Sequence, residues 1–239
     1  MDRDGWILDG EKVAVPFGTV ADVFVVTAAD PGGSVLVALV DRDAAGVSIQ
    51  EAVGTAGDPQ ARLLLDGCRV VGGRVLAGAA HTAYRIAVAG LCATAAGLLD
   101  GGLRLTASYI AGREQFGRPI AAFQGPAMRI ADAYIDVQAV WAATWSAVWR
   151  LDTGRPADDA LAIAKFWVAD GGQRAVHAFQ HLHGGIGVDV EYPIHRYFSQ
   201  AKALEVALGG ASVQLERLGA SIAAAAVGAG PGAAVGTGT

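Results

Sequence analysis

Short apolar runs separated by turn-forming residues fill the first 78 residues of the chain. The seven runs lie at residues 6–8, 12–15, 23–26, 34–40, 47–49, 62–65 and 69–71. Asp9-Gly10 separates the first two runs, and an Asp-Gly pair in that position predicts a tight hairpin. Turns about every 8–12 residues are typical of an antiparallel sandwich or barrel. We therefore predict a β-rich domain over residues 1–78.

Beyond residue 78 the apolar positions recur at intervals of three and four residues, which predicts helices. The four stretches with this spacing are residues 84–110, 123–151, 157–181 and 194–222. Gly209 and Gly210 are a candidate break in the last stretch, and Pro126 suits the first turn of the second. Four helices with apolar stripes predict a four-helix bundle over residues 79–225. Residues 226–239 hold almost no packing residues, so we expect a disordered tail.

The composition fits a soluble α+β protein. Hydrophobic residues make up 53% of the chain and charged residues 17%, which argues against extensive disorder. A net charge of −5 gives no electrostatic case for binding nucleic acid or an anionic membrane. The apolar run at residues 79–99 is interrupted by His81 and Arg85, whereas a membrane span needs about 20 nearly unbroken apolar residues. The charged N-terminus is unlike a signal peptide, and two cysteines without framework spacing favour a reducing, cytoplasmic location.

The first motif that could carry chemistry is R-E-Q-F-G-R-P-I-x-x-F-Q at residues 113–124. It follows the end of a predicted helix, and a turn there would bring Arg113, Gln115 and Gln124 close together. The rigid donor fork of arginine is suited to phosphate. The competing interpretation is that Arg113 only complements the carbonyl end of the helix, and for a lone arginine that interpretation is favoured.

The second motif is H-G-G-I-G at residues 183–187, followed by E-Y-P. Gly184, Gly185 and Gly187 would let the backbone approach a ligand closely, although glycines also occur in ordinary turns between helices. The G-x-G-x-x-G spacing of a dinucleotide fingerprint is missing, and no strand precedes the motif. His177 and His181 lie four residues apart, but no third ligand or H-E-x-x-H pattern supports a metal site. We expect no metal.

The order of these motifs resembles the acyl-CoA dehydrogenase family. R-E-Q-F-G-R-P-I-x-x-F-Q, H-G-G-I-G, E-Y-P-I-H-R-Y and A-K occur here in the family's sequence order. The opening D-G-W-I-L-D-G-E-K-V-A-V is also similar to the family's middle domain. The resemblance covers residues 4 to 222 and implies a β-domain, a C-terminal four-helix bundle and FAD held between subunits.

The resemblance also assigns cofactor contacts. It implies that Arg113 and Phe116 touch the FAD of a neighbouring subunit and that Gln124 lies near the same cofactor. Gly184, Gly185 and Gly187 would support the adenosine end of FAD. The family usually has glutamine three residues before the first of these glycines, where this chain has His181.

Two departures from the family pattern bear on function. The family's N-terminal helical domain and its T-E-P-x-x-G-S-D strand would precede residue 1, so the chain is expected to be a fragment or a shortened subunit. The family's catalytic glutamate is replaced by Leu208, and the alternative base position on the first bundle helix holds Tyr84. Neither side chain can abstract a proton at neutral pH.

Three functions remain open. The favoured one is a subunit of a heteromeric acyl-CoA dehydrogenase, as known for steroid side chains in actinobacteria, acting on an acyl-CoA thioester with a homologous catalytic subunit. The second is an independently active dehydrogenase with a relocated base, for which Glu205 is the nearest candidate. The third is a flavin-free scaffold. Because Trp141, Trp145, Trp149 and Trp167 make the helices unusually apolar, we expect a homo- or hetero-oligomer.

Overall fold

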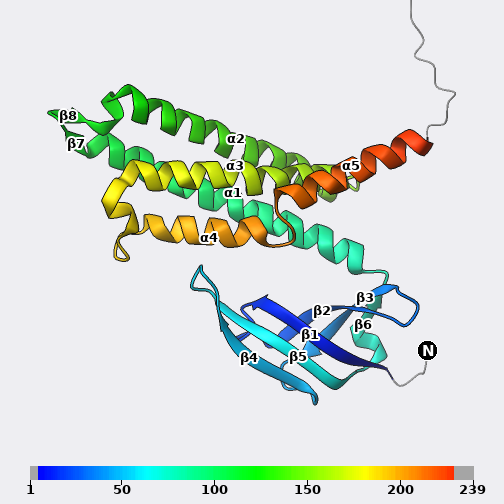
Figure 1. Ribbon diagram of the computed structural model, residues 1–239. Helices are drawn as coiled ribbons and strands as arrows, with labels where there is room; N and C mark the ends of the chain where they lie inside the picture. Colours follow the sequence, from blue (N-terminus) through cyan, green and yellow to red (C-terminus); the bar gives the residue numbers. More distant parts are fainter. Residues whose placement is uncertain (1–4, 229–239) are drawn as a thin grey trace, which may run out of the picture. The chain divides into compact units, whose positions relative to one another are not determined.

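The computed structural model describes residues 5–228 and divides the chain into two compact units, Met1–Ala87 and Val88–Thr239 (Figure 1). The strands are β1 (Trp6–Pro16), β2 (Val23–Ala29), β3 (Val35–Asp41), β4 (Val47–Val53), β5 (Pro59–Val70), β6 (Val75–Ala77), β7 (Glu114–Gln115) and β8 (Arg118–Pro119). The long helices are α1 (Ala80–Gly112), α2 (Gln124–Asp152), α3 (Asp158–His183), α4 (Ile194–Val206) and α5 (Ala211–Gly228). Short 3-10 turns lie at Gly72–Arg74, Ile120–Ala122 and Gly184–Val188.

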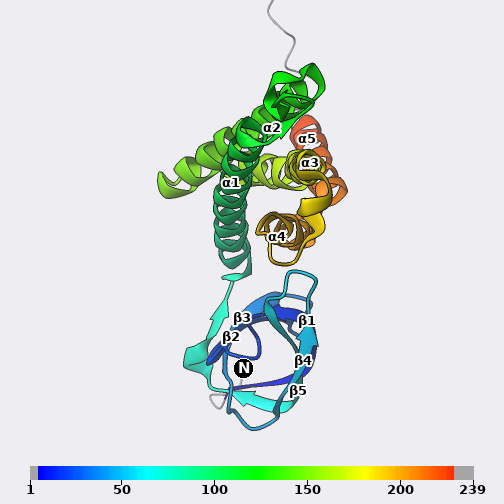
Figure 2. The ribbon, with the colours of Figure 1, turned by 90° about the vertical axis from the view of Figure 1, so that its left-hand side faces the viewer.

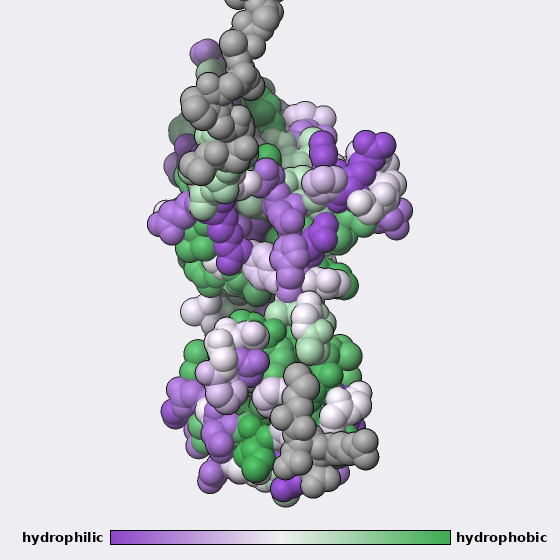
Figure 3. Space-filling view, turned by 90° about the vertical axis from the view of Figure 1, so that its right-hand side faces the viewer, coloured by the Kyte–Doolittle hydropathy of each residue, from purple (hydrophilic) through white to green (hydrophobic). Residues whose placement is uncertain are grey.

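The strands of the first unit form two antiparallel sheets, in the orders β1-β5-β4 and β2-β3-β6. Figure 2 shows the strands arranged around a common interior. Phe24, Val40, Leu63 and Cys68 are among the residues buried there. Other apolar residues of this unit, such as Val25, are exposed. Figure 3 shows hydrophobic residues interspersed with hydrophilic ones on one face of the molecule. The expected antiparallel β-domain is confirmed.

The hairpin predicted at Asp9-Gly10 is wrong. β1 continues through this pair, and its pairing with β5 shifts register between Leu8 and Gly10. The Asp9 carboxylate accepts a hydrogen bond from the Gly67 N–H at 2.7 Å, and Gly10 has a φ of 139°. The Asp-Gly pair therefore does not form a turn: it lies opposite a bulge in β5, where Asp66 and Gly67 face the single residue Asp9. β5 likewise runs unbroken through Gly67 and joins two runs that the sequence pattern separates.

The helical period is confirmed, with the fourth stretch divided into α4 and α5. The break lies at the candidate position, where Gly209 has a φ of 99°, and Pro126 lies in the first turn of α2. α1 and α3 pack closely at Gly102: a Cβ added to this glycine would lie only 3.0 Å from the Phe179 ring. α5 ends at Gly228, so residues 229–239 of the expected tail lie outside the described residues.

Among the described helices, α1 is long and apolar enough to cross a membrane when judged by length and composition alone. The core helix of a soluble protein meets the same criterion. Val88, Cys92 and Leu99 of α1 are buried within the protein. This helix therefore gives only weak evidence for a membrane span.

Candidate functional site

The R-E-Q-F-G motif forms a small hairpin at the end of α1. The Arg113 N–H donates to the Tyr109 carbonyl at 2.9 Å, and the Ile120 N–H donates to the Arg113 carbonyl at 2.8 Å. β7 and β8 pair between these points, and Gly117 takes a φ of 76°. These hydrogen bonds fix the backbone of the hairpin, while Arg113 remains exposed.

Phe116 stands at the tip of this hairpin. Its φ is 51°, which is strained for a non-glycine residue, and 94% of its surface is exposed. Phe123 packs against the hairpin. Its ring meets the Phe116 ring edge-on, with centroids 6.3 Å apart, and its centroid lies 4.0 Å from the Arg118 guanidinium carbon. Gln124 follows at the start of α2 and is exposed. An aromatic ring held out from the surface at a conformational cost indicates a contact with another molecule.

The glycine motif forms the turn after α3, and its three glycines have different structural reasons. The Gly184 N–H donates to the His181 carbonyl, and Gly184 takes a φ of 61° that ends the helix. A Cβ added at Gly184 or Gly185 would meet nothing within 4 Å, so this stretch of backbone is open to a ligand. A Cβ at Gly187 would lie 2.8 Å from the Gln180 side-chain amide nitrogen and 3.2 Å from the Gln180 carbonyl oxygen, so Gly187 packs closely on Gln180.

An aromatic cluster brings the two motifs to the same end of the helical unit. Tyr109 of α1 stacks on His183 of α3, with ring centroids 4.5 Å apart, and Tyr192 packs against both rings. Arg113 lies one helical turn beyond Tyr109, and Gly184 follows His183 directly. His183 Nδ1 donates to the Phe179 carbonyl at 2.8 Å, while burial lowers the pKa of the imidazole.

His183 should make the helical unit sensitive to acid. Its pKa lies below the ordinary value in the folded state, so the unfolded chain binds the proton more tightly as pH falls through about 6.5. Stability should be full above that pH and decline below it. Denaturant unfolding at pH 7.5 and 5.5 should show a smaller loss for His183→Phe, which keeps the stacking on Tyr109. Exposed His181→Phe is the control, and an unchanged loss in His183→Phe would contradict the assignment.

The α4–α5 turn holds Leu208, the residue that the resemblance assigns to the family's base position. Leu208 has a φ of 58°, in the left-handed region, and is partly exposed. The buried Gln214 side chain donates to the carbonyls of Leu208 at 3.2 Å and Gly209 at 3.1 Å. Buried Lys165 donates to the Glu205 carbonyl at 2.8 Å, and its burial lowers the pKa of the amine. Two buried polar side chains therefore brace one strained turn.

Gln214→Leu should destabilise the helical unit by about 1–3 kcal/mol, because the carbonyls of Leu208 and Gly209 lose their side-chain donor while the shape is kept. Urea denaturation followed by circular dichroism would measure the loss. Gln173→Leu, at an exposed position of α3, should stay within about 0.5 kcal/mol of the parent. Equal effects for the two variants would show that the bracing contributes little.

Glu205, the alternative base candidate, is already paired. Its carboxylate accepts a hydrogen bond from Lys202 Nζ at 2.5 Å on the same helix. Tyr84, at the second base position, is half-buried in the first unit. Glu205 is therefore engaged in an ion pair, and Tyr84 carries no carboxylate.

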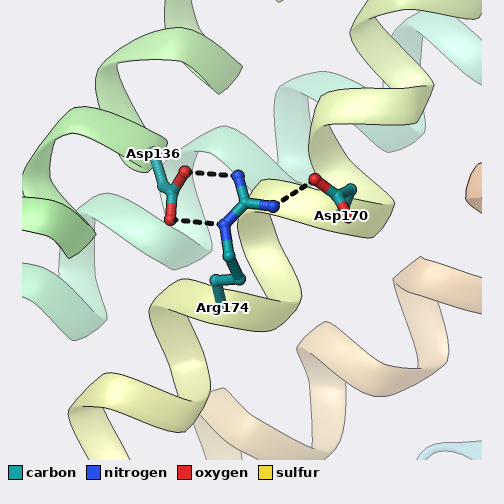
Figure 4. Close-up of polar contacts among 3 residues, drawn as sticks. All are labelled: Asp136, Asp170 and Arg174. Carbon is teal, nitrogen blue, oxygen red and sulfur yellow. Dashed lines mark hydrogen bonds and ion pairs between the residues drawn. The ribbon is translucent and has the colours of Figure 1, made fainter.

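Three polar side chains that connect the helices were not predicted from the sequence. Lys165 and Gln214 brace the α4–α5 turn, and a lone lysine or glutamine within an apolar stripe was the only available signal. Arg174 joins α2 to α3: its guanidinium donates to both oxygens of Asp136, at 2.6 and 3.1 Å, and pairs with Asp170 (Figure 4). Hydrogen bonding to Asp136 raises the pKa of Arg174. His177 packs its ring against Phe198, and the described residues contain no group of three potential metal ligands.

A β-domain is followed by a helical bundle that carries the arginine-phenylalanine hairpin and the open glycine turn at one end. The model of the acyl-CoA dehydrogenase C-terminal domain matches residues 77–223. The chain belongs to the acyl-CoA dehydrogenase family.

The chain is similar to particular members of that family. FadE27 and FadE28 of Mycobacterium tuberculosis are each 39% identical, over 92% and 90% of this chain and 61% and 62% of their own length. The solved structure of the Tcur3481-Tcur3483 steroid ACAD variant is 43% identical, with a TM-score of 0.89, over 95% of this chain and 62% of that one. The ChsE4-ChsE5 complex of M. tuberculosis is 40% identical, with a TM-score of 0.88, over 92% and 60%. The chain thus spans about three fifths of these relatives.

Proposed function

We propose that this chain is one subunit of a heteromeric, FAD-dependent acyl-CoA dehydrogenase and completes a flavin site on a homologous catalytic subunit. Leu208 carries the proposal. A braced and strained turn at the family's base position presents an apolar side chain, which cannot accept a proton at any pH. The proton leaving C2 of the thioester must therefore go to a carboxylate on another chain.

The hairpin end of the helical unit is suited to part of a flavin dinucleotide. Arg113 offers a forked donor for the pyrophosphate, Phe116 offers an exposed ring, and the open backbone at Gly184 and Gly185 allows close approach. The remaining positions assigned by resemblance, Gln124, His181 and Gly187, belong to the same end. When bound, FAD supplies the hydride acceptor for α,β-dehydrogenation. These residues bind and orient the cofactor, and they do not transfer protons.

The proposed substrate is an acyl-CoA thioester, and a steroid side-chain thioester is the favoured class. This choice is supported by two similar solved structures, a steroid ACAD and the two-component ChsE4-ChsE5 complex. An independently active enzyme using Glu205 is disfavoured by the ion pair with Lys202.

Purifying the full chain alone and after co-expression with its homologous partner tests the proposal. We expect the visible absorbance bands of bound flavin only for the complex. We also expect thioester dehydrogenation only for the complex. A chain that is yellow and active alone would establish an independent enzyme. A complex that forms without flavin at the shared site would instead establish a scaffold, and either result overturns the proposal.

A further inference from the structure

Arg118 follows the tip of the hairpin, and the flavin contacts proposed above do not use it. Its guanidinium carbon lies 4.0 Å from the centroid of the Phe123 ring. Within residues 5–228, the Arg118 side chain has no ion-pair partner. An exposed arginine that lies over a ring, and not beside a carboxylate, makes a cation–π contact with that ring. The position of Arg118 is therefore tied to the position of Phe123.

The tip of the hairpin needs support from outside. Backbone hydrogen bonds hold its base, but only two residue pairs join β7 to β8. The loop residues Phe116 and Gly117 have φ values of 51° and 76°. Two positive φ values in a two-residue loop are typical of a type I′ turn, whose first position favours asparagine or aspartate. Phenylalanine is strained there, so its exposed conformation must be stabilised by a neighbour.

Phe123 is that neighbour, and its own position is fixed by α2. Its N–H donates to the Ile120 carbonyl at 3.1 Å, and its carbonyl accepts from the Ala127 N–H at 3.0 Å. The Phe116 and Phe123 rings meet at 81° with centroids 6.3 Å apart, which is the geometry of an edge-to-face pair. Because Phe116 is 94% exposed, this contact orients the ring while burying little of it.

Arg118 restrains the ring of Phe123 in turn. Phe123 is only half-buried, so the protein interior packs against it on one side. The guanidinium covers the ring from the hairpin, and a rotation of the ring would break this contact. Arg118 pairs with Gln115 across the hairpin, so the hairpin that presents Phe116 also carries the cation that holds its support.

We propose that Arg118 is a positioning residue of the flavin site: its guanidinium holds the Phe123 ring, which holds Phe116 in the conformation that meets the cofactor. This role rests on the proposed function, because it requires FAD to contact Phe116 in the assembled complex. Arg113 then binds the cofactor directly, whereas Arg118 raises the fraction of hairpins that are ready to bind. Apparent affinity falls in proportion when that fraction falls.

Reconstitution of the complex with FAD, after removal of its flavin, tests this role through the Kd measured by flavin fluorescence. Arg118→Met keeps the side-chain length but loses the charge, and should raise the Kd about 3- to 10-fold. Arg118→Lys keeps a cation over the ring and should stay within about 2-fold of the parent. Arg104→Met removes another exposed arginine and should leave the Kd unchanged, which controls for net charge.

The turnover rate separates positioning of the cofactor from general damage to the complex. At saturating FAD, Arg118→Met should dehydrogenate the thioester within about 2-fold of the parent rate, because the hairpin is then occupied in every complex. Thermal unfolding checks that the variant is as stable as the parent. A lower rate at saturating FAD together with a lower Tm would overturn the positioning role in favour of a structural one.

A direct contact between Arg118 and the pyrophosphate is the competing explanation, and a double-mutant cycle separates the two. In a Phe116→Ala background, Arg118→Met should add less than about 2-fold to the Kd, because the ring that it positions is gone. Phe116→Ala truncates an exposed side chain, so the fold is kept. An undiminished effect of Arg118→Met in this background would overturn the proposal, as would an unchanged Kd for Arg118→Met alone.

Arg113→Ala, measured in the same titration, distinguishes failure of the positioning role from failure of the proposed function. If Arg113→Ala weakens FAD binding while Arg118→Met does not, the flavin site stands and Arg118 has no part in it. If neither variant changes the Kd, the hairpin does not contact FAD, and both the positioning role and the proposed function are wrong.

Discussion

Arg113→Ala is expected to weaken flavin retention in the assembled complex by roughly 10- to 150-fold, because a lost charge-assisted phosphate contact costs about 1.5–3 kcal/mol. The Arg113 backbone is held by hydrogen bonds to Tyr109 and Ile120, so truncating its exposed side chain should leave the fold intact. Flavin content after dilution and gel filtration measures the loss, and a thermal unfolding curve checks the structure.

Two further variants sharpen this experiment. Arg113→Lys should lie between the parent and Arg113→Ala, because a point charge cannot make the forked contact. Arg104→Ala removes another exposed arginine of α1, one that pairs only with Asp100 at the surface, and should retain flavin fully. Flavin content that is unchanged in Arg113→Ala would reject a cofactor role for this residue.

Glu205→Gln is expected to leave turnover of the complex within a few-fold, whereas removing the partner's catalytic carboxylate should abolish it. Glu205 lies three residues before Leu208 on a different turn of backbone, and its carboxylate is bound to Lys202. One helical turn displaces a side chain by about 5 Å, and catalysis tolerates little misplacement of the base. Steady-state rates with a saturating thioester provide the comparison.

The control is Glu216→Gln, a carboxylate on the exposed face of α5, which should match Glu205→Gln. If Glu205→Gln alone lowers the rate by about 10²-fold or more, the scale of a lost general base, then this chain is a catalyst in its own right. That outcome would refute the base-lacking role.

The two halves of the fold were predictable because each has a clear hydrophobic period. Each helix buries one face and ends near a glycine or proline. The spacing of apolar residues was therefore enough to predict the bundle. The strands were harder. Asp9-Gly10 has the composition of a turn, but it stays within a strand because it pairs with β5, whose Gly67 is distant in sequence. Residues 75–77, paired with β3 as β6, had too short an apolar run to be recognised.

For the candidate site, only the motif residues could be predicted from the sequence. Arg113, Phe116 and the glycines could be singled out by resemblance, but nothing local indicates that Tyr109 stacks on His183, 74 positions away in the chain, and joins the two motifs. Lys165 and Gln214 were not predicted at all, because a side chain that braces a backbone carbonyl leaves no periodic trace. Such contacts depend on elements that meet only after folding.

The amino-acid sequence by itself determined the class of protein: its periods specify a β-domain and a helical bundle, and its motifs identify the family. The tertiary structure decided which residues hold those motifs in place and which remain exposed. It left Phe116 exposed on a strained hairpin and held Leu208 in a left-handed turn. The physical reason is that sequence periodicity reports which face of an element is apolar, whereas burial, strain and hydrogen-bond partners depend on what each face meets in three dimensions.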